Sequence, residues 1–211
     1  MLSRSAPLLF DAPTLSLFEK RLLNIPTFKF KFKPDAKDAA VLLPLCTVNQ
    51  KPSVLFTVRN LNMRTHRGEI SFPGGKSDPT DTNVEHTALR ETTEEIGLPS
   101  SSIDILGRYA AVPNYNGSLR VHPFVGFIPQ DIDIAKLDYN PDEVSSVFSL
   151  PIDYLLQPQV RELRGFRDSK HKYTVFKVPD HLGLAETEIW GLTSFIMDGK
   201  STCTHVRLIE N

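Results

Sequence analysis

The sequence Gly-Gly-Lys at 74–76, followed by Arg-Glu-Thr-Thr-Glu-Glu-Ile-Gly-Leu at 90–98, decides the fold of this chain. A helix is expected to join the two segments. Thr82 and the Glu three residues later have the spacing of a capping box, in which each side chain binds a free main-chain N–H at a helix start. Gly97 stands where a left-handed C-cap residue belongs. These signals predict a helix over 83–96.

Three carboxylates of this predicted helix share one face. At about 100° per residue, Glu91, Glu94 and Glu95 fall within an arc of roughly 100°, with apolar residues on the opposite side. Like charges at this spacing destabilise a helix by about 0.2–0.5 kcal/mol per pair. Mg²⁺ prefers carboxylate oxygen and removes that cost. A solvated acidic face is the alternative, but the adjacent Arg90 and the Gly-Gly loop upstream favour a metal site.

The segment from Gly75 to Leu98 resembles the Nudix box, Gly-x5-Glu-x7-Arg-Glu-apolar-x-Glu-Glu-x-Gly-apolar. Its second half matches at every charged position and at the glycine, with Thr92 where an apolar residue is usual. The first half departs from the pattern. The early acid is Asp81 rather than Glu, and eight residues separate it from Arg90.

The resemblance implies an α/β fold, namely a Nudix-type α/β/α sandwich with a mixed β-sheet. Strand and helix patterns in mixed order along the chain agree with that class. A chain of 211 residues can bury a core in one domain. We expect an N-terminal segment with a short helix over 1–25, a single Nudix hydrolase domain over 26–200 and a C-terminal tail over 201–211.

The same resemblance implies roles for the residues of the motif. Glu91 and Glu95 would hold Mg²⁺ or Mn²⁺, and Glu94 would be a further ligand or would orient the attacking water. The main-chain carbonyl of Gly75 would complete the coordination. Arg90 would act in catalysis by holding the glutamates in position. Metal ions held there would neutralise a diphosphate and lower the pKa of a water.

Two residues outside the motif can each be interpreted in two ways. The family places an acid at an Asn-x-x-Glu-Val step, which Glu143 matches, so Glu143 is a candidate metal ligand or general base. The alternative is an ordinary carboxylate at a strand edge. Tyr115 lies in a turn-rich loop over 114–117, where it could stack on an adenine or simply cover the loop.

A second motif precedes the Gly-Gly loop. Arginines placed just before that loop can pair bidentately with phosphates, although they could also only solubilise it. The stretch resembles the signature of the coenzyme A diphosphatase branch of Nudix enzymes, Leu-Leu-Thr-x-Arg-Ser/Ala-x3-Arg-x3-Gly-x3-Phe-Pro-Gly-Gly. Phe56 replaces a Leu and Asn60 replaces the Ser or Ala. The implied substrate-binding residues are Arg59, Arg64, Gly68, Phe72 and Gly74.

This second resemblance implies hydrolysis of CoA or acyl-CoA at the internal diphosphate, giving 3′,5′-ADP and (acyl-)4′-phosphopantetheine. One alternative is a nucleotide-pool diphosphatase acting on oxidised nucleoside triphosphates or NADH. Another is a catalytically inactive module that binds CoA. The expected partner is a small-molecule substrate, and the expected assembly is a monomer or homodimer.

Composition argues against two other partners. The net charge of −1 offers no electrostatic case for nucleic-acid binding. No apolar run reaches the ~20 residues that a membrane span needs. Arg4, two serines and no acid before Asp11 weakly resemble a mitochondrial presequence, so a mitochondrial or cytosolic location is expected. The last residues are not the Ser-Lys-Leu peroxisomal signal.

Periodicity predicts further features of the chain. His122 is expected to be a hydrogen-bonded structural histidine, Cys46 an inert buried thiol and Trp190 a core residue. Pro44 implies that the apolar strand containing it is an edge strand or is bulged. The predicted segments are an amphipathic helix over 13–25, a half-exposed strand over 28–33, a buried strand over 39–48 and a mobile loop over 157–171.

Overall fold

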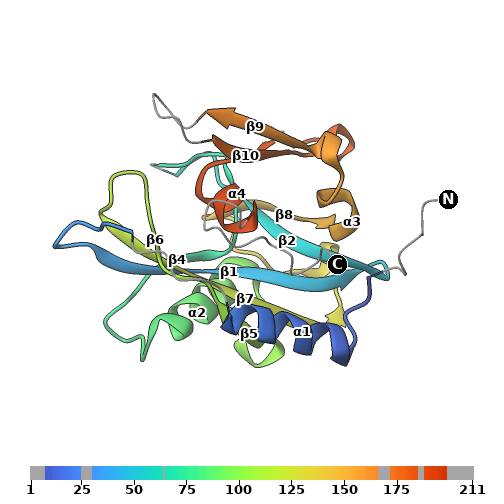
Figure 1. Cartoon of the computed structure of the whole chain (residues 1–211), viewed down its shortest axis with the longest axis horizontal. Coiled ribbons are helices and arrows are strands. Elements are labelled where there is room, and N and C mark those ends of the chain that lie inside the picture. Colours follow the sequence, from blue (N-terminus) through green and yellow to red (C-terminus); the bar gives the residue numbers. More distant parts are fainter. Residues whose placement is uncertain (1–7, 25–29, 64, 166–171, 185–187, 199–211) are drawn as a thin grey trace.

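A computed structural model describes residues 8–24, 30–63, 65–165, 172–184 and 188–198 (Figure 1). The large sheet contains β1 (Lys37–Val48), β2 (Lys51–Arg59), β3 (Ile70–Ser71), β4 (Gly74–Lys76), β5 (Asp104–Arg108), β6 (Val112–Pro113), β7 (Leu119–Asp131) and β8 (Val144–Pro151). A smaller sheet contains β9 (Arg161–Gly165), β10 (Lys172–Lys177) and β11 (Glu188–Ile189). The α-helices are α1 (Ala12–Leu23), α2 (Val84–Ile96), α3 (Ile152–Leu155) and α4 (Gly191–Asp198).

The two faces of the large sheet bury separate cores. On one face, Leu42 and Phe124 of the sheet pack with Ala88 and Ile96 of α2. The other face packs against α1, α3, α4 and the smaller sheet. In Figure 1 the smaller sheet lies above the large one and α2 lies below it. The predicted α/β/α sandwich with a mixed sheet is confirmed, with a small sheet added to one outer layer.

The central strand β1 changes partner along one edge. It runs parallel to β7 on the other edge. On the first edge, residues 39–41 pair with β4 and residues 45–48 pair with β2. Pro44, which has no N–H to donate, lies between these two registers, and Leu42 donates its N–H to the Pro73 carbonyl at 2.9 Å. Of the two predicted alternatives, the edge strand is therefore wrong, whereas the register of β1 against β7 does shift, between Cys46 and Thr47. The change of partner leaves room for Gly74 and Gly75 beside β1, so the segment expected to be a loop is the strand β4, which lies against α2.

At the two ends of α2, the predicted C-cap is confirmed and the predicted N-terminal capping box is corrected. Gly97 is the C-cap, with a left-handed φ of 71°. At the other end Asn83 is the N-cap, and its Oδ1 accepts the N–H of His86 at 2.8 Å. The predicted capping box of Thr82 and Glu85 is wrong, because Asn caps a helix at least as well as Thr and stands one residue later. The predicted extent of the helix is confirmed.

Near the N-terminus the helix prediction is confirmed and the strand prediction fails. α1 buries Phe18 and Leu22. Residues 30–33 are not a strand, and 28–29 lie outside the described residues. The ring of Phe30 packs edge-on against that of Phe195 at 6.1 Å, while an arginine of β7 lies over the ring of Phe32 at 5.2 Å. The alternating aromatic residues thus serve separate tertiary partners instead of one face of a sheet.

Two predictions in the C-terminal third are corrected. Part of the predicted loop over 157–171 is the strand β9, which pairs with β10, and residues 166–171 lie outside the described part of the chain. Trp190 is 40% exposed rather than buried. The preceding Ile189, the last residue of β11, is fully buried and takes the core position expected of Trp190.

The predictions for two single residues, His122 and Cys46, are confirmed. His122 Nε2 lies 2.8 Å from an oxygen of Asp38, which confirms a hydrogen-bonded structural role. Cys46 is buried, and its burial raises the pKa of the thiol to about 12, so the thiol is unreactive at neutral pH. Tyr115 is 80% exposed, and both of its interpretations stay open.

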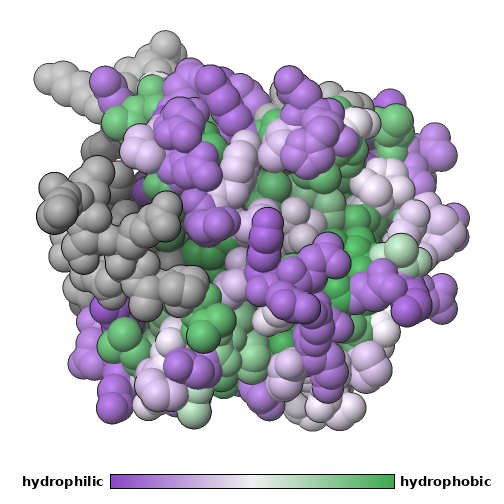
Figure 2. Space-filling view, turned by 90° about the vertical axis from the view of Figure 1, so that its right-hand side faces the viewer, coloured by the Kyte–Doolittle hydropathy of each residue, from purple (hydrophilic) through white to green (hydrophobic). Residues whose placement is uncertain are grey.

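The side of the molecule at the right of Figure 1 faces the viewer in Figure 2. Hydrophilic and hydrophobic residues are interspersed over its coloured surface. Within the described ranges, none of the helices combines the length and apolar character required to cross a bilayer.

Candidate active site and metal centre

The acidic face of α2 meets the turn before β8 at one point. One carboxylate oxygen from each of Glu91, Glu95 and Glu143 lies within 4.8 Å of the others. Glu91 and Glu95 are one helical turn apart on α2, as their spacing predicts. Glu143 arrives from a distant part of the sequence, because β8 pairs along β2 and starts immediately after it. We call these three residues the carboxylate cluster.

Within the cluster the negative charge is incompletely balanced. The Glu95 side chain is only 3% exposed, and Arg59 Nη1 lies 3.8 Å from one of its oxygens. Burial raises the pKa of Glu95 to about 8, although the N–H of Gly74, 3.1 Å from the carboxylate, and Arg59 oppose that shift. Burial also raises the pKa of Glu91. Several carboxylates short of positive charge form a donor set that fits a hard divalent cation.

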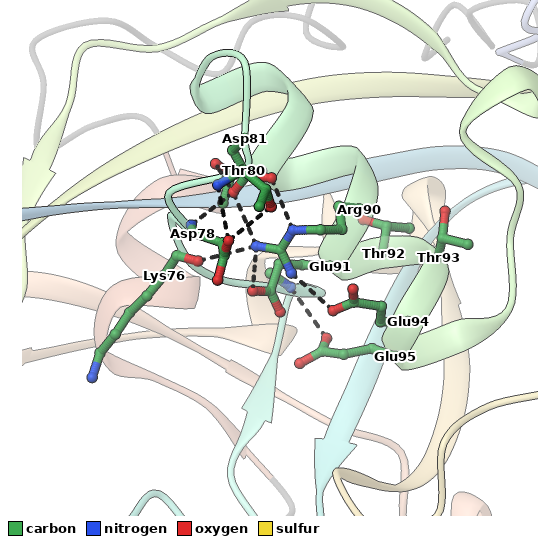
Figure 3. A network of polar contacts seen from close by, with 12 residues as sticks. Lys76, Asp78, Thr80, Asp81, Arg90, Glu91, Thr92, Thr93, Glu94 and Glu95 are labelled. Atoms are coloured by element: carbon green, nitrogen blue, oxygen red, sulfur yellow. Dashed lines mark hydrogen bonds and ion pairs between the residues drawn. The ribbon is translucent and has the colours of Figure 1, made fainter.

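Arg90 joins the early acid of the motif to the cluster (Figure 3). Its Nε and Nη2 atoms donate to the two oxygens of Asp81 at 2.9 and 3.0 Å. The same guanidinium lies 3.0 Å from a Glu91 oxygen and 2.8 Å from a Glu94 oxygen. The two hydrogen bonds that Arg90 donates to Asp81 hold the pKa of Asp81 well below its usual range. Although the motif spacing departs from the usual pattern, Asp81 therefore anchors Arg90, and Arg90 holds Glu91.

Replacing Asp81 by Asn should lower the free energy of unfolding by about 2–3 kcal/mol at pH 7, because charge-assisted hydrogen bonds are lost at a side chain only 2% exposed. The pKa of Asp81 is lower in the folded than in the unfolded protein. Its contribution to stability is therefore present above about pH 4 and declines as the pH falls towards the folded-state value. Urea unfolding of both proteins at pH 7 and at about pH 3 checks this. An equal difference at both pH values would contradict it.

Glu94 is not brought into the carboxylate cluster. Its side chain is 53% exposed and pairs with Arg90. In Figure 3 it extends from α2 beside Arg90, while Glu95 lies below it. Its roles as a metal ligand and as a catalytic residue stay predictions, and Glu143 is the third carboxylate that the fold supplies instead.

The two glycines of β4 are needed for different reasons. Gly74 has a φ of 148°, and a Cβ there would collide with the main-chain carbonyl of Ala40. A Cβ on Gly75 would collide with the carboxylate of Glu91. Gly74 thus permits the backbone conformation, whereas Gly75 leaves the space that a cluster side chain occupies. Coordination of a metal by the Gly75 carbonyl stays a prediction.

The other residues predicted to bind substrate differ in position. Arg59, 22% exposed, lies at the cluster, whereas Arg64 lies outside the described residues. Phe72 is 3% exposed and stacks on Phe56 with ring centroids 5.4 Å apart. Phe72 therefore supports the segment before β4 from the core, and its role in substrate binding stays a prediction. Gly68 is buried and has a left-handed φ of 69°, and its role in substrate binding stays a prediction.

Asn140 was not assigned a role from the sequence. Its N–H donates to the Glu95 carbonyl at 3.0 Å, and its Nδ2 lies 3.4 Å from a Glu143 oxygen. It therefore joins the turn before β8 to the end of α2. An Asn-Pro dipeptide is typical of a turn, but the contact of Asn140 with α2 depends on the tertiary fold.

Comparison with known proteins finds Nudix proteins similar to this chain. The NUDIX domain family model matches residues 36–169. The chain is 38% identical over 195 residues to Nudix hydrolase 3 of Caenorhabditis elegans, covering 85% of this chain and 80% of that protein. It is 38% identical over 183 residues to the mitochondrial coenzyme A diphosphatase NUDT8 of Homo sapiens, covering 85% and 73%. It is 34% identical over 187 residues to the uncharacterized Nudix hydrolase NudL of Photorhabdus laumondii, covering 87% and 94%.

Solved structures show the same fold. A MutT/nudix family protein from Enterococcus faecalis superposes with a TM-score of 0.50 at 16% identity, covering 90% of this chain and 73% of that one. At that identity the likeness speaks for the fold alone. The family match covers more than half of the chain and includes the Gly-Gly loop, α2 and Glu143. This chain belongs to the Nudix hydrolase family.

Proposed function

We propose that this protein is a metal-dependent diphosphatase that hydrolyses CoA or acyl-CoA to 3′,5′-ADP and (acyl-)4′-phosphopantetheine. The observation that carries the proposal is the convergence of Glu91, Glu95 and Glu143 beside the Gly-Gly loop. Nudix hydrolases generally use divalent metal ions. The choice of substrate is supported by the motif that contains Arg59 and by 38% identity to a human coenzyme A diphosphatase.

Each cluster residue has a definite task in this proposal. Glu91 and Glu95 would hold Mg²⁺ or Mn²⁺, which when bound supplies charge neutralisation and an acidified water. Glu143 would serve as a third ligand or as the general base that takes a proton from the attacking water. Arg90 would keep Glu91 in place through the 3.0 Å contact between them. Arg59, at the edge of the cluster, has the planar donor geometry that pairs with diphosphate oxygens.

Competition between substrates tests the proposal. The purified protein is incubated with equal concentrations of CoA, 8-oxo-dGTP and NADH, with Mg²⁺ or Mn²⁺, and the products are identified by mass spectrometry. We expect 3′,5′-ADP and 4′-phosphopantetheine to accumulate first. Preferential formation of 8-oxo-dGMP, or of AMP with reduced nicotinamide mononucleotide, would identify a nucleotide-pool enzyme instead. CoA binding by calorimetry without any product would identify an inactive binding module.

The cellular location is a separate proposal. The human and mouse NUDT8 proteins are described as mitochondrial, and we propose a mitochondrial location here too. Fractionation of cells that express the full chain with a C-terminal tag tests it. Recovery of the tagged protein only in the cytosolic fraction would contradict it.

A further inference from the structure

The position of Glu143 in the carboxylate cluster depends on contacts outside the cluster. Glu91 and Glu95 are held by the backbone of α2, but Glu143 belongs to a turn. Two unit charges 4 Å apart repel by about 4 kcal/mol at the effective dielectric constant of a protein surface. Whenever Glu143 and a carboxylate of α2 are both charged, this repulsion opposes the position of Glu143 in the cluster. The turn stays in place only if other contacts hold it.

Asn60, the residue after β2, makes such contacts with its main chain and with its side chain. Its N–H donates to the Glu143 carbonyl at 2.8 Å. Its Nδ2 donates to the carbonyl of Pro141, two residues before Glu143. Its Oδ1 accepts the N–H of Asn62 at 2.8 Å, which orients the amide. One side chain therefore ties the turn to the loop that follows β2.

These contacts begin where the sheet ends. The pairing between β2 and β8 changes register after Val58, and its last pair joins Arg59 to Val144. Glu143 is therefore one residue beyond the last strand pair. The main-chain hydrogen bond of Asn60 to Glu143 extends the attachment by one residue, and the bond to Pro141 extends it further. On the other side of the turn, Asn140 provides the attachment to α2.

We propose that Asn60 is a positioning residue that holds Glu143 within the carboxylate cluster. The inference rests on the metal site of the proposed function but not on the identity of the substrate. The coenzyme A diphosphatase signature has Ser or Ala at this position. Ser has one atom fewer than Asn between its Cα and its donor group, and Ala has no donor. Asn60 can thus reach the Pro141 carbonyl across a gap that those residues span less well.

Mn²⁺ binding without substrate tests the proposal. Free Mn²⁺ is followed by electron paramagnetic resonance in the wild type, Asn60→Ala, Glu143→Gln and the double variant. We expect Asn60→Ala to weaken Mn²⁺ binding roughly 10-fold, the lower end of the effect of removing residues that orient a ligand. In the Glu143→Gln background the same substitution should add less than about 2-fold, because Asn60 acts through Glu143.

Asn62→Ala is the matched control, since Asn62 contributes only its main-chain N–H to the contact described above and keeps it after substitution. Its Mn²⁺ affinity should equal that of the wild type. If Asn60→Ala does not fold, Asn60→Ser takes its place in the cycle. Unchanged affinity in the Asn60 variant, or an equal loss in both backgrounds, overturns the inference. Unchanged affinity in Glu143→Gln overturns it too, because Glu143 is then not a ligand.

Failure of the proposed substrate gives a different result. If the wild type does not cleave CoA but Asn60 and Glu143 remain coupled in Mn²⁺ binding, the substrate assignment is wrong and the positioning role stands.

Discussion

Replacing Glu95 by Gln is expected to reduce CoA turnover with Mg²⁺ or Mn²⁺ by more than about 100-fold, the upper range for residues that merely orient a ligand. Gln has the same shape and can still accept the N–H of Gly74, which lies 3.1 Å from the carboxylate. It lacks the charge that holds a cation. Burial raises the pKa of Glu95 to about 8, so at neutral pH its carboxyl group ionises more readily in the unfolded than in the folded protein, which lowers the stability. Gln lacks this penalty, and the metal-free variant should unfold at the same or a higher temperature.

Steady-state kinetics and calorimetric unfolding without metal measure both effects. Glu85→Gln is the matched control, since Glu85 is an exposed carboxylate in the first turn of the same helix. Wild-type turnover in Glu95→Gln would remove Glu95 from the mechanism. Glu94→Gln adds a second comparison. Because Glu94 is exposed and lies outside the cluster, Glu94→Gln should reduce turnover less than Glu95→Gln does. An equal reduction would support Glu94 as a metal ligand.

Gly75→Ala is expected to lower kcat/KM for CoA by about 100-fold, the typical effect of misplacing a catalytic group by about 1 Å. The new Cβ would occupy the position of the Glu91 carboxylate. That carboxylate is also held by Arg90 at 3.0 Å, so it yields only by leaving the cluster. Mn²⁺ affinity should fall with kcat/KM. Because the collision is with a side chain, the loss of stability should be modest.

Gly74→Ala is the comparison that distinguishes an effect on the carboxylate cluster from strain in the backbone. Its Cβ would meet the main-chain carbonyl of Ala40, and its φ of 148° strains any other residue. The free energy of unfolding should therefore fall by about 1–3 kcal/mol or more. Urea unfolding of both variants, with kinetics, checks the contrast. Full activity in Gly75→Ala would show that Glu91 tolerates displacement and would contradict the assigned role of Gly75.

The errors in the sequence interpretation share a cause. Pro44 suggests an edge strand or a bulge, but β1 changes partner at that residue and stays central. The Phe-Lys alternation before β1 suggests a strand, yet its rings pack on α4 and under an arginine of β7. In each case a local pattern was overridden by a partner that lies far away in the chain.

The sequence by itself determined α2, its C-cap at Gly97 and the alignment of Glu91 with Glu95, because these depend on helical spacing and on a glycine that tolerates positive φ. Only the tertiary structure decided that Glu143 joins those two residues while Glu94 pairs with Arg90. The physical reason is that the position of Glu143 depends on the pairing of β8 with β2 and on the hydrogen bonds of Asn60 and Asn140. Contacts between such distant segments leave no spacing pattern along the chain.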